Sequence, residues 1–243
     1  MGAKLSKRLE FVANFVTETR IADIGCDHGK LTEYLFENKI IEYALVSDVS
    51  LPSVKKAENL LKVNNRNFDW AFADGFNGVN EKHNVKQAII AGMGGLEIIK
   101  ILKQNKTSIN KFVLQPQNNE LKLKKYLLKN NYHILNDIII KDKHIFYNVL
   151  RVEKKDSRQK ISKFNLLFSN ENFKNNADFY LYLQFLHKKY NKILISLPKL
   201  KRHKTKKMVY YVNKAINLWE KCNGKNITIS KNWWWNSKAN KRK

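Results

Sequence analysis

The sequence predicts an α/β protein in which a Rossmann-like parallel sheet is followed by a helical coiled-coil domain. Short β-branched runs alternate with amphipathic stretches from residue 21 to about residue 152, as in βα units around a parallel sheet. Farther along the chain, apolar residues recur at heptad spacing and basic residues become dense. A chain of 243 residues is long enough for both parts. We therefore expect a first domain at residues 1–153, a second at 154–229 and a basic tail at 230–243.

Four short apolar runs predict the parallel strands of the first domain, at residues 21–24, 41–46, 88–91 and 112–114. Apolar residues three and four apart predict its helices, at residues 31–36, 53–63, 96–102 and 120–128. Two further β-like runs, at 134–140 and 145–152, leave no room for a helix between them. They predict an antiparallel hairpin that closes the sheet, an ending that a plain dinucleotide-binding sheet lacks.

Two heptad series predict the helices of the second domain. The first series is Phe179, Leu183, Leu186, Tyr190, Ile193 and Leu197, and the second is Met208, Tyr211, Ala215, Leu218 and Cys222. Residues 198–207 contain Pro, two adjacent basic pairs and no apolar periodicity, so we expect the turn of an antiparallel helical hairpin there. A short amphipathic segment at 161–168 is expected to pack against this hairpin. The tail is polar and basic apart from Trp233, Trp234 and Trp235, and we expect it to be mobile.

The charge predicts a polyanionic partner, either a nucleic acid or an anionic membrane surface. The chain has 46 Lys and Arg against 21 Asp and Glu, a formal net charge of +25. An AT-rich coding bias would also raise the lysine content, but it would do so everywhere. Residues 1–153 hold 23 basic and 17 acidic side chains, whereas residues 154–243 hold 23 basic and 4 acidic ones. This concentration favours a polyanion-binding C-terminal domain.

The remaining composition predicts a protein of a reducing compartment. Two cysteines, Cys26 and Cys222, form neither a disulfide framework nor a paired-thiolate metal site. The N-terminus lacks the apolar core of a signal peptide, and no segment approaches the roughly 18 apolar residues of a spanning helix. We therefore expect a cytoplasmic protein that does not enter a membrane.

Residues 23–29, Asp-Ile-Gly-Cys-Asp-His-Gly, lie where the first predicted strand turns into the first predicted helix. Glycines at such a turn let the backbone approach a ligand closely. The dinucleotide fingerprint G-x-G-x-x-G seats a pyrophosphate, but Asp27 occupies its second glycine position, and a carboxylate there would repel that group. The same carboxylate is compatible with a cationic, phosphate-free ligand such as S-adenosylmethionine.

Two further aspartates follow the next two apolar stretches. Asp48 ends the second predicted strand, where it can accept hydrogen bonds from ribose hydroxyls, and Asp74 is placed to receive an adenine amino group. Each aspartate can instead be a helix cap or a turn residue, although the ordered series of three favours a ligand site. The candidate cofactor-binding residues are Asp23, Gly25, Cys26, Asp48, Val49, Asp74, Gly75, Ala91 and Gly92.

The fourth predicted strand ends in residues 91–95, Ala-Gly-Met-Gly-Gly, in a chain that has only nine glycines. Ligands bind beyond the carboxyl ends of such strands, so we expect this loop to face the transferred group and its small residues to leave room for a flat base. A tight strand-to-helix turn is the alternative explanation, but it does not require three glycines.

Three motifs together resemble those of the bacterial tRNA (adenine22-N1)-methyltransferase family. They are residues 22–28 (ADIGCDH), 91–95 (AGMGG) and 114–117 (LQPQ), in the family's order and approximate spacing over the first 150 residues or so. The resemblance implies a class I methyltransferase fold, S-adenosylmethionine as the donor, and methylation of N1 of an adenine in the tRNA D-arm. The family's C-terminal part is a helical coiled coil associated with tRNA binding, which agrees with the heptads and the charge.

The chain departs from the family in two places. The family usually continues Asp-His with Ala-Tyr-Leu-Pro, where this chain has residues 29–32, Gly-Lys-Leu-Thr. Lys30 therefore replaces an aromatic residue that is suited to stack on the target base. Many relatives have a Glu-Val pair where this chain has Asp48 and Val49, and the aspartate keeps an acceptor for ribose.

The candidate catalytic residues are Asp27, His28, Met93 and Gln115. Methylation at N1 builds positive charge on the base, which Asp27 can stabilise, or Asp27 can accept a proton from N6 while His28 orients the base or relays the proton. Both residues can instead cap the following helix. Gln115 can hydrogen-bond the adenine edge or tie down its own loop. We expect no metal ion.

The candidate RNA-binding residues form the densest basic cluster, at the turn of the helical hairpin. They are Lys199, Lys201, Arg202, Lys204, Lys206 and Lys207. They would contact tRNA phosphates and so contribute affinity but little sequence choice. A charge run can equally be a solvated loop. We expect a monomer whose partner is tRNA.

Three other functions compete with this one. A methyltransferase for another tRNA or rRNA base fits the charge equally well. A non-catalytic RNA-binding relative is supported only by the missing aromatic at Lys30. A nicotinamide oxidoreductase is disfavoured by Asp27 at the pyrophosphate position.

Overall fold

The computed structural model describes residues 5–224, which form two compact units. The first unit ends at Asn172 and the second begins at Phe173. The division lies beyond residue 153 because the intervening segment bonds to the last strands: the Gln159 side chain pairs with the backbone of Ile134, and Asn172 Oδ1 accepts a hydrogen bond from the backbone of Ile139. The tryptophans of the predicted tail lie outside the described residues.

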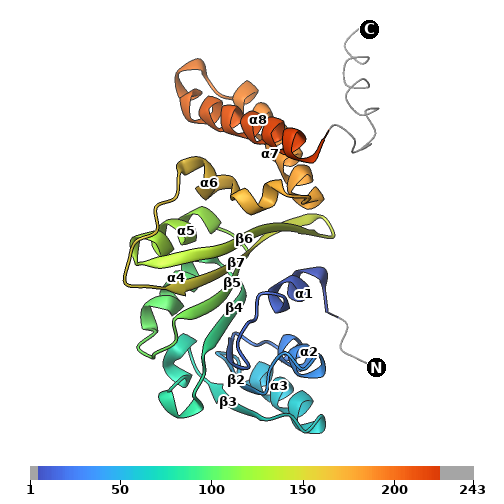
Figure 1. Ribbon diagram of the computed structural model, residues 1–243, viewed down its shortest axis with the longest axis vertical. Helices are drawn as coiled ribbons and strands as arrows, with labels where there is room; N and C mark the ends of the chain where they lie inside the picture. Colours follow the sequence, from blue (N-terminus) through green and yellow to red (C-terminus); the bar gives the residue numbers. More distant parts are fainter. Residues whose placement is uncertain (1–4, 225–243) are drawn as a thin grey trace. The chain divides into compact units, whose positions relative to one another are not determined.

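A seven-stranded sheet forms the centre of the first unit, in the order β3-β2-β1-β4-β5-β7-β6 (Figure 1). Neighbouring strands among the first five pair in parallel, whereas β7 is antiparallel to β5 and to β6. The predicted hairpin at the end of the sheet is therefore confirmed. The strands are β1 Arg20–Ile24, β2 Tyr43–Asp48, β3 Phe68–Phe72, β4 Gln87–Met93, β5 Lys111–Pro116, β6 Tyr132–Asp142 and β7 Ile145–Lys154.

Helices cover both faces of this sheet because its strands are apolar on both sides. One core combines Ala22 and Ile24 with residues of α4 and α5, and the other combines Ile21 with residues of α1, α2 and α3. Figure 1 shows the two groups of helices on opposite sides of the strands. The helices are α1 Lys7–Ala13, α2 Lys30–Glu37, α3 Leu51–Val63, α4 Gly95–Gln104, α5 Glu120–Lys129 and α6 Lys163–Phe168, with short 3-10 turns at Gly75–Gly78, Glu81–His83 and Asn170–Phe173.

Side-chain caps explain where several helices begin. Ser50 Oγ accepts the backbone N–H of Ser53 at 3.4 Å at the start of α3, and Ser162 Oγ accepts that of Asn165 at 3.1 Å at the start of α6. Helix α6 corresponds to the predicted segment at 161–168, and it belongs to the first unit, where it contacts α5. Among the described residues, no helix combines the length and apolarity of a membrane span.

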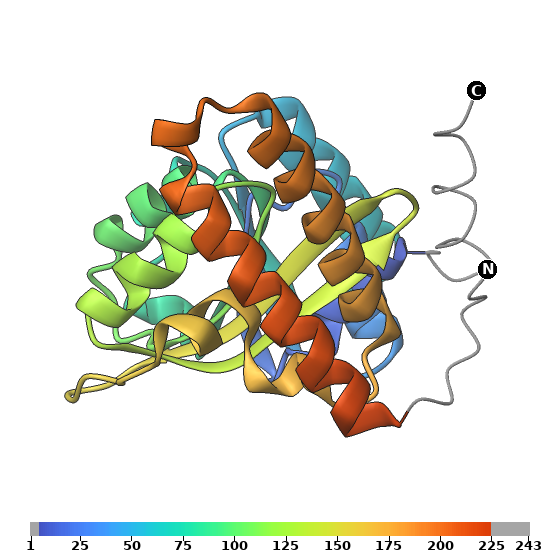
Figure 2. The same ribbon diagram turned by 90° about the horizontal axis from the view of Figure 1, so that it is seen from above.

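The second unit contains two antiparallel helices, α7 Ala177–Ser196 and α8 His203–Asn223, joined by a 3-10 turn at Lys199–Lys201 (Figure 2). The start of α7 lies beside the end of α8, since Tyr180 donates to Glu220 and its ring stacks on Trp219 at 4.4 Å between centroids. The first half of the predicted α7 series is buried, at Phe179, Leu183 and Leu186.

Two details of the predicted hairpin were wrong. The buried positions of α8 are Val212, Ala215 and Trp219, one residue later than predicted at two of the three positions, and Cys222 is exposed. The shift follows from Trp219, whose indole N–H donates to the backbone carbonyl of Asn176. The turn is also shorter than residues 198–207, because α8 already begins at His203.

Candidate cofactor and acceptor site

Five loops that carry predicted site residues follow β1, β2, β3, β4 and β5 at one edge of the sheet, because the carboxyl ends of parallel strands share an edge. Several contacts join these loops. Asp27 N donates to Asp48 Oδ2 at 3.1 Å, and Gln117 N donates to the carbonyl of Met93 at 2.8 Å. The structure thus brings together loops from separate parts of the chain, as the order of the motifs predicts.

The loop after β1 is shaped by Gly25. The backbone N–H groups of Gly25 and Cys26 both donate to the carbonyl of Ser47, at 2.8 and 3.0 Å, which folds the loop over the end of β2. Gly25 has φ +79°, and a Cβ atom there would collide with the Cε methyl of Met93. Only glycine satisfies both requirements, so Met93 forms the wall against which this loop closes.

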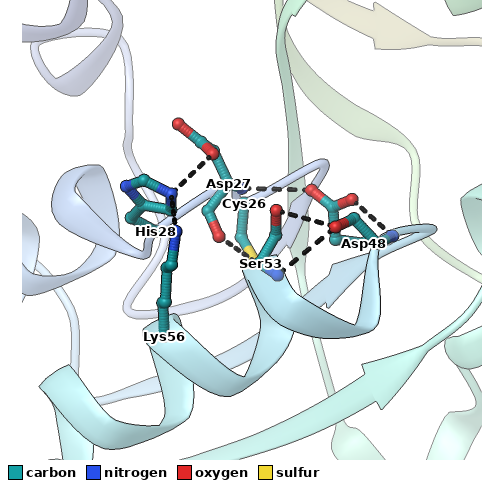
Figure 3. Close-up of polar contacts among 7 residues, drawn as sticks. Cys26, Asp27, His28, Asp48, Ser53 and Lys56 are labelled. Atoms are coloured by element: carbon teal, nitrogen blue, oxygen red, sulfur yellow. Dashed lines mark hydrogen bonds and ion pairs between the residues drawn. The ribbon is translucent and has the colours of Figure 1, made fainter.

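Asp48 joins the first two loops. Its Oδ2 accepts the N–H of Asp27 and its Oδ1 accepts the N–H of Ser50 at 2.9 Å (Figure 3). Each carboxylate oxygen can accept a second hydrogen bond, so the group retains acceptors for a ligand hydroxyl. The neighbouring Val49 is 64% exposed and gives the site an open apolar surface next to these acceptors.

Asp23 lies beneath the loop and is 3% exposed. Its Oδ2 accepts a hydrogen bond from Thr32 Oγ1 at 2.7 Å, which ties β1 to α2. Burial raises the pKa of Asp23 to about 6; the Thr32 hydrogen bond opposes this shift, and the charges of Asp48 and Asp27 add to it. The side chain therefore supports the loop from the interior instead of facing an open site.

Asp27 and His28, the predicted acid-base residues, lie next to each other in the loop after β1. Asp27 adopts φ +50° and its side chain is 79% exposed. Its Oδ1 atom lies 3.5 Å from His28 Nε2, and the same nitrogen lies 3.2 Å from Lys56 Nζ of α3 (Figure 3). Protonated Nε2 can donate to Asp27, whereas unprotonated Nε2 can accept from Lys56.

The other predicted residues of these loops have structural partners. Cys26 is 6% exposed, and burial raises the pKa of its thiol far above the ordinary value, which makes the thiol unreactive. Asp74 forms an ion pair with Lys100 at 3.2 Å while its side chain stays 44% exposed. Gly75 has φ +59°, and a Cβ there would collide with Gln104.

Gln115 is fully buried and ties down its own loop. Its Oε1 accepts hydrogen bonds from Arg8 Nη1 at 2.5 Å and from Gly92 N at 3.1 Å, and its Nε2 donates to the carbonyl of Pro116 at 2.9 Å. Of the two roles considered for Gln115, the structure supports the loop-tying role. Its amide fixes the backbone that follows Ala91.

The glycine density after β4 has a local cause. Gly95 N donates to the carbonyl of Asn118 at 3.0 Å, and a Cβ on Gly95 would lie 2.7 Å from that oxygen. The loops after β4 and β5 therefore approach each other more closely than a side chain permits. Gly92 has φ +81°, and a Cβ atom there would contact Arg8 Nη1 at 3.6 Å and Gln117 Nε2 at 3.8 Å.

The predicted RNA-binding residues lie at the turn and in the first turns of α8. All are exposed except Arg202, which is partly buried and donates from Nε to the carbonyl of Leu197 at 2.8 Å. Lys204, Lys206 and Lys207 lie near the N-terminus of α8, where the helix dipole disfavours positive charge. This placement has a small cost in helix stability.

Sequence reasoning missed two cations of the site, Arg8 and Lys56. Both lie on helices, α1 and α3, and not in the strand-end loops that the motifs identify. Only the folded structure shows that their side chains contact Gln115 and His28. Among residues 5–224, no group of His, Cys, Asp and Glu side chains is arranged to hold a metal ion.

Comparisons with known proteins extend this description. Residues 5–150 match a family model described as a methyltransferase domain. The chain is 36% identical over 163 residues to a Mycoplasma genitalium protein assigned as a tRNA methyltransferase, a match that covers 65% of this chain and 74% of that protein. It is 30% identical over 159 residues to the tRNA (adenine22-N1)-methyltransferase of Bacillus subtilis, covering 63% of this chain and 66% of that enzyme.

A solved structure matches both units of the chain. It is a Streptococcus pneumoniae protein assigned as a tRNA (m1A22) methyltransferase, in complex with S-adenosyl-L-methionine. The match has a TM-score of 0.77 and 26% identity, and it covers 88% of this chain and 100% of that chain.

Proposed function

Because the chain belongs to the tRNA (adenine22-N1)-methyltransferase family, we propose that it transfers a methyl group from S-adenosylmethionine to N1 of adenine 22 in tRNA. The observation that carries the proposal is the position of Asp48. Its carboxylate stands at the end of β2, holds the Asp27 loop and keeps acceptors for a ribose. This arrangement suits a nucleoside ligand without phosphates.

The residues present fit this cofactor. Gly25 lets the loop after β1 close against Met93 without a side chain in between, and Asp23, Asp27 and Asp48 place negative charge around this loop. Negative charge favours a sulfonium cation and opposes a pyrophosphate. Asp48 would hold the ribose, Val49 would contact the adenine, and Asp74 would accept the adenine amino group after giving up its exposed ion pair with Lys100.

S-adenosylmethionine would supply an electrophilic methyl group to the lone pair of adenine N1, with the S–CH3 bond breaking and the sulfur leaving as the neutral thioether of S-adenosylhomocysteine. Because N1 lies on the Watson-Crick edge, the target base must leave its stack and pair before it can enter the site. The chain's own residues then position the base and exclude water, which provides most of the rate. Asp27 stabilises the positive charge that forms on the base, and His28 accepts or returns the N6 proton.

The exposed lysines of α8 supply the tRNA contacts in this proposal, through phosphates instead of bases. The proposal includes a monomer that acts on tRNA in the cytoplasm. Sedimentation of the free protein and of its tRNA complex tests the monomer.

The test is transfer of radiolabelled methyl to unmodified tRNA transcripts that carry adenine or guanine at position 22. We expect label on the adenine transcript only. Label on both transcripts would keep a methyltransferase but move its target to another base. Absence of label, despite binding of cofactor and tRNA, would contradict the proposal in favour of a non-catalytic RNA-binding protein.

A further inference from the structure

A cavity of about 200 Å³ lies beside β6, the outermost strand of the sheet. Its walls are residues 134–137 of β6 on one side and residues between 159 and 171, a segment that includes α6, on the other. All of them belong to the first unit. Three strand spacings of about 4.8 Å, roughly 14 Å in all, separate β6 from β4, whose loop carries part of the candidate site. The cavity is therefore distinct from that site.

A β-bulge in β6 shapes this cavity. The pairing of β6 with β7 skips Leu135, because Ile134 and Asn136 oppose consecutive residues of β7. In a regular strand, neighbouring side chains point to opposite faces, whereas a bulge bends the strand and redirects its side chains. Here it lets four consecutive residues of β6 border one cavity, while Leu135 at the bulge stays 38% exposed.

The cavity has apolar walls and the size of a single flat ring. Strand β6 contributes Ile134 and Leu135, and the segment around α6 contributes Ile161 and Leu166. A cavity of about 150 Å³ can hold one benzene ring. The larger volume beside β6 therefore has room for a nucleobase between two apolar walls.

Polar side chains of the cavity are available to such a ring. Asn165, Ser169 and Asn170 line it, and within residues 5–224 none of the three forms a hydrogen bond through its side chain. Gln159 and Glu171, in contrast, are already bound to the backbone of β6. A side-chain amide presents a donor beside an acceptor, the pattern that matches the edge of a base. The lining thus suits a neutral ring with a polar edge.

A basic segment runs along the cavity. Residues 154–163 hold five basic side chains and one acidic one. Gln159 and Ile161 line the cavity, whereas the alternate residues Arg158 and Lys160 are exposed. No carboxylate of the described part of the chain forms an ion pair with either cation. Two such cations next to a cavity for a flat ring match a base that is joined to a phosphate.

We propose that this cavity binds one nucleotide of the tRNA, with its base between β6 and α6 and its phosphate against Arg158 and Lys160. The inference rests on the proposed function, which makes tRNA the partner, and it adds a nucleotide other than the methylated adenine. The base must be unpaired, because a base that is paired and stacked cannot enter a cavity. The contact therefore selects RNA that exposes an unpaired base at a fixed distance from the methylation site.

The test uses full-length variants that change the cavity and leave the strand-end loops untouched. Leu135→Trp places an indole at the exposed bulge, and Ile145→Trp makes a similar change at an exposed position of the same hairpin outside the cavity. Asn165→Leu removes a polar edge at nearly the same volume. A double variant, Arg158→Met with Lys160→Met, removes both cations. Filter binding measures tRNA affinity over a range of salt concentrations, and thermal unfolding checks that each variant is folded.

We expect Leu135→Trp and Asn165→Leu to weaken tRNA binding by about tenfold with the salt slope of the wild type, because they remove a base contact and no phosphate contact. Ile145→Trp should bind as the wild type does. The double variant should lower the salt slope by about 0.7 for each lost phosphate contact. An unchanged slope would contradict the assignment of the phosphate to Arg158 and Lys160.

Transcripts with a single abasic nucleotide identify the bound base. At one position, loss of the base should weaken binding to the wild type about as much as Leu135→Trp does, and it should have no further effect on Leu135→Trp. A free nucleotide is the other source of the same chemistry. If nucleoside monophosphates bind the wild type and not Leu135→Trp in calorimetry, while tRNA affinity is unchanged, the assignment to tRNA is wrong.

Two results would overturn the inference as a whole. One is wild-type binding of tRNA and of the monophosphates by both Leu135→Trp and Asn165→Leu. The other is an equal loss of tRNA affinity in Ile145→Trp and Leu135→Trp, which would mean that the cavity itself has no part in binding. Methyl transfer by the wild-type protein judges the proposed function separately, and at saturating tRNA the cavity variants should keep the wild-type kcat.

Discussion

At the scale of single residues, the candidate site contains carboxylates that differ in burial and in the groups they contact. Asp23 is buried and supports the first loop, Asp48 holds two backbone N–H groups, and Asp27 is exposed beside His28. The sequence predicts all three, because each stands at or just after the carboxyl end of a predicted strand. It cannot tell them apart, since burial is decided by α2 and α3, which pack over β1 and β2.

The contact of Arg8 with the loop residues could not be predicted from the sequence. Arg8 belongs to a seven-residue helix that no motif identifies, and it reaches Gln115 across 107 positions of sequence. Gln115 itself was chosen from its motif, but its amide turns inward because Arg8 and Gly92 both need an acceptor there.

Replacing Asp48 tests its role in cofactor binding. Asp48→Ala removes the acceptors for the ribose and releases the Asp27 and Ser50 N–H groups. We expect the dissociation constant for S-adenosylhomocysteine to rise by about tenfold or more, since hydrogen bonds to charged groups contribute about 1.5–3 kcal/mol. Calorimetry measures it. Asp69→Ala, an exposed aspartate on β3, serves as the control, and equal affinities of the two variants would argue against the assignment.

Asp27→Asn separates charge from turn geometry. Asparagine tolerates the left-handed conformation that Asp27 adopts at φ +50°, so the loop should keep its shape. We expect kcat for tRNA methylation to fall by about a hundredfold, because the positive charge on the methylated base loses its partner. Single-turnover assays at saturating cofactor measure this rate. A wild-type rate would leave Asp27 with a turn-forming role only.

Asp23 predicts a pH dependence of stability. Its pKa is raised in the fold, so its contribution to the free energy of unfolding is fully present below its ordinary pKa, near pH 4, and is lost as the pH rises through about 6. Asp23→Asn lacks this titration. Relative to wild type, the variant should gain up to about 3 kcal/mol between pH 4 and pH 7. Urea unfolding at several pH values checks this, and a constant difference would contradict it.

At the scale of elements, the alternation of apolar runs and amphipathic stretches predicted most strands and helices of the first unit, because buried parallel strands are continuously apolar. The edge strand β3 lacks that signal, since Trp70 and Phe72 are exposed. The predicted buried face of α8 was wrong by one residue because Leu218 and Trp219 are adjacent apolar residues, and either could be buried. Contacts of Trp219 with Tyr180 and Asn176 in the folded unit bury Trp219.

The lysines at the start of α8 are predicted to contribute to tRNA binding. Changing Lys204, Lys206 and Lys207 to alanine should weaken tRNA binding and reduce the salt slope by about 0.7 to 0.9 for each lost phosphate contact, without changing cofactor affinity. The helix itself should become slightly more stable, because cations leave its N-terminus.

A matched triple variant controls for net charge. Lys82, Lys86 and Lys106 are exposed and lie near the amino ends of the strands, away from the site. Their replacement by alanine should leave tRNA binding near the wild-type value. The same salt slope in both triple variants would show that α8 has no special part in RNA binding.

At the scale of the whole molecule, the three motifs and the uneven charge predicted the class of enzyme, and the family match confirms it. The motifs were informative because they contain both the glycines that form the turns at the strand ends and the polar residues of the candidate site. The division between the two units was harder to predict, because residues 155–172 join the first unit through polar side chains that bond to β6, and such bonds cannot be recognised in the sequence.

The most direct test of the central claim is to identify the modified nucleoside. Unmodified tRNA with adenine at position 22 is incubated with the protein and S-adenosylmethionine, and it is then analysed by mass spectrometry of its nucleosides and by primer extension. The account predicts 1-methyladenosine and a stop of the primer at position 22, both absent with guanine there. Methylation at any other base or atom would contradict it.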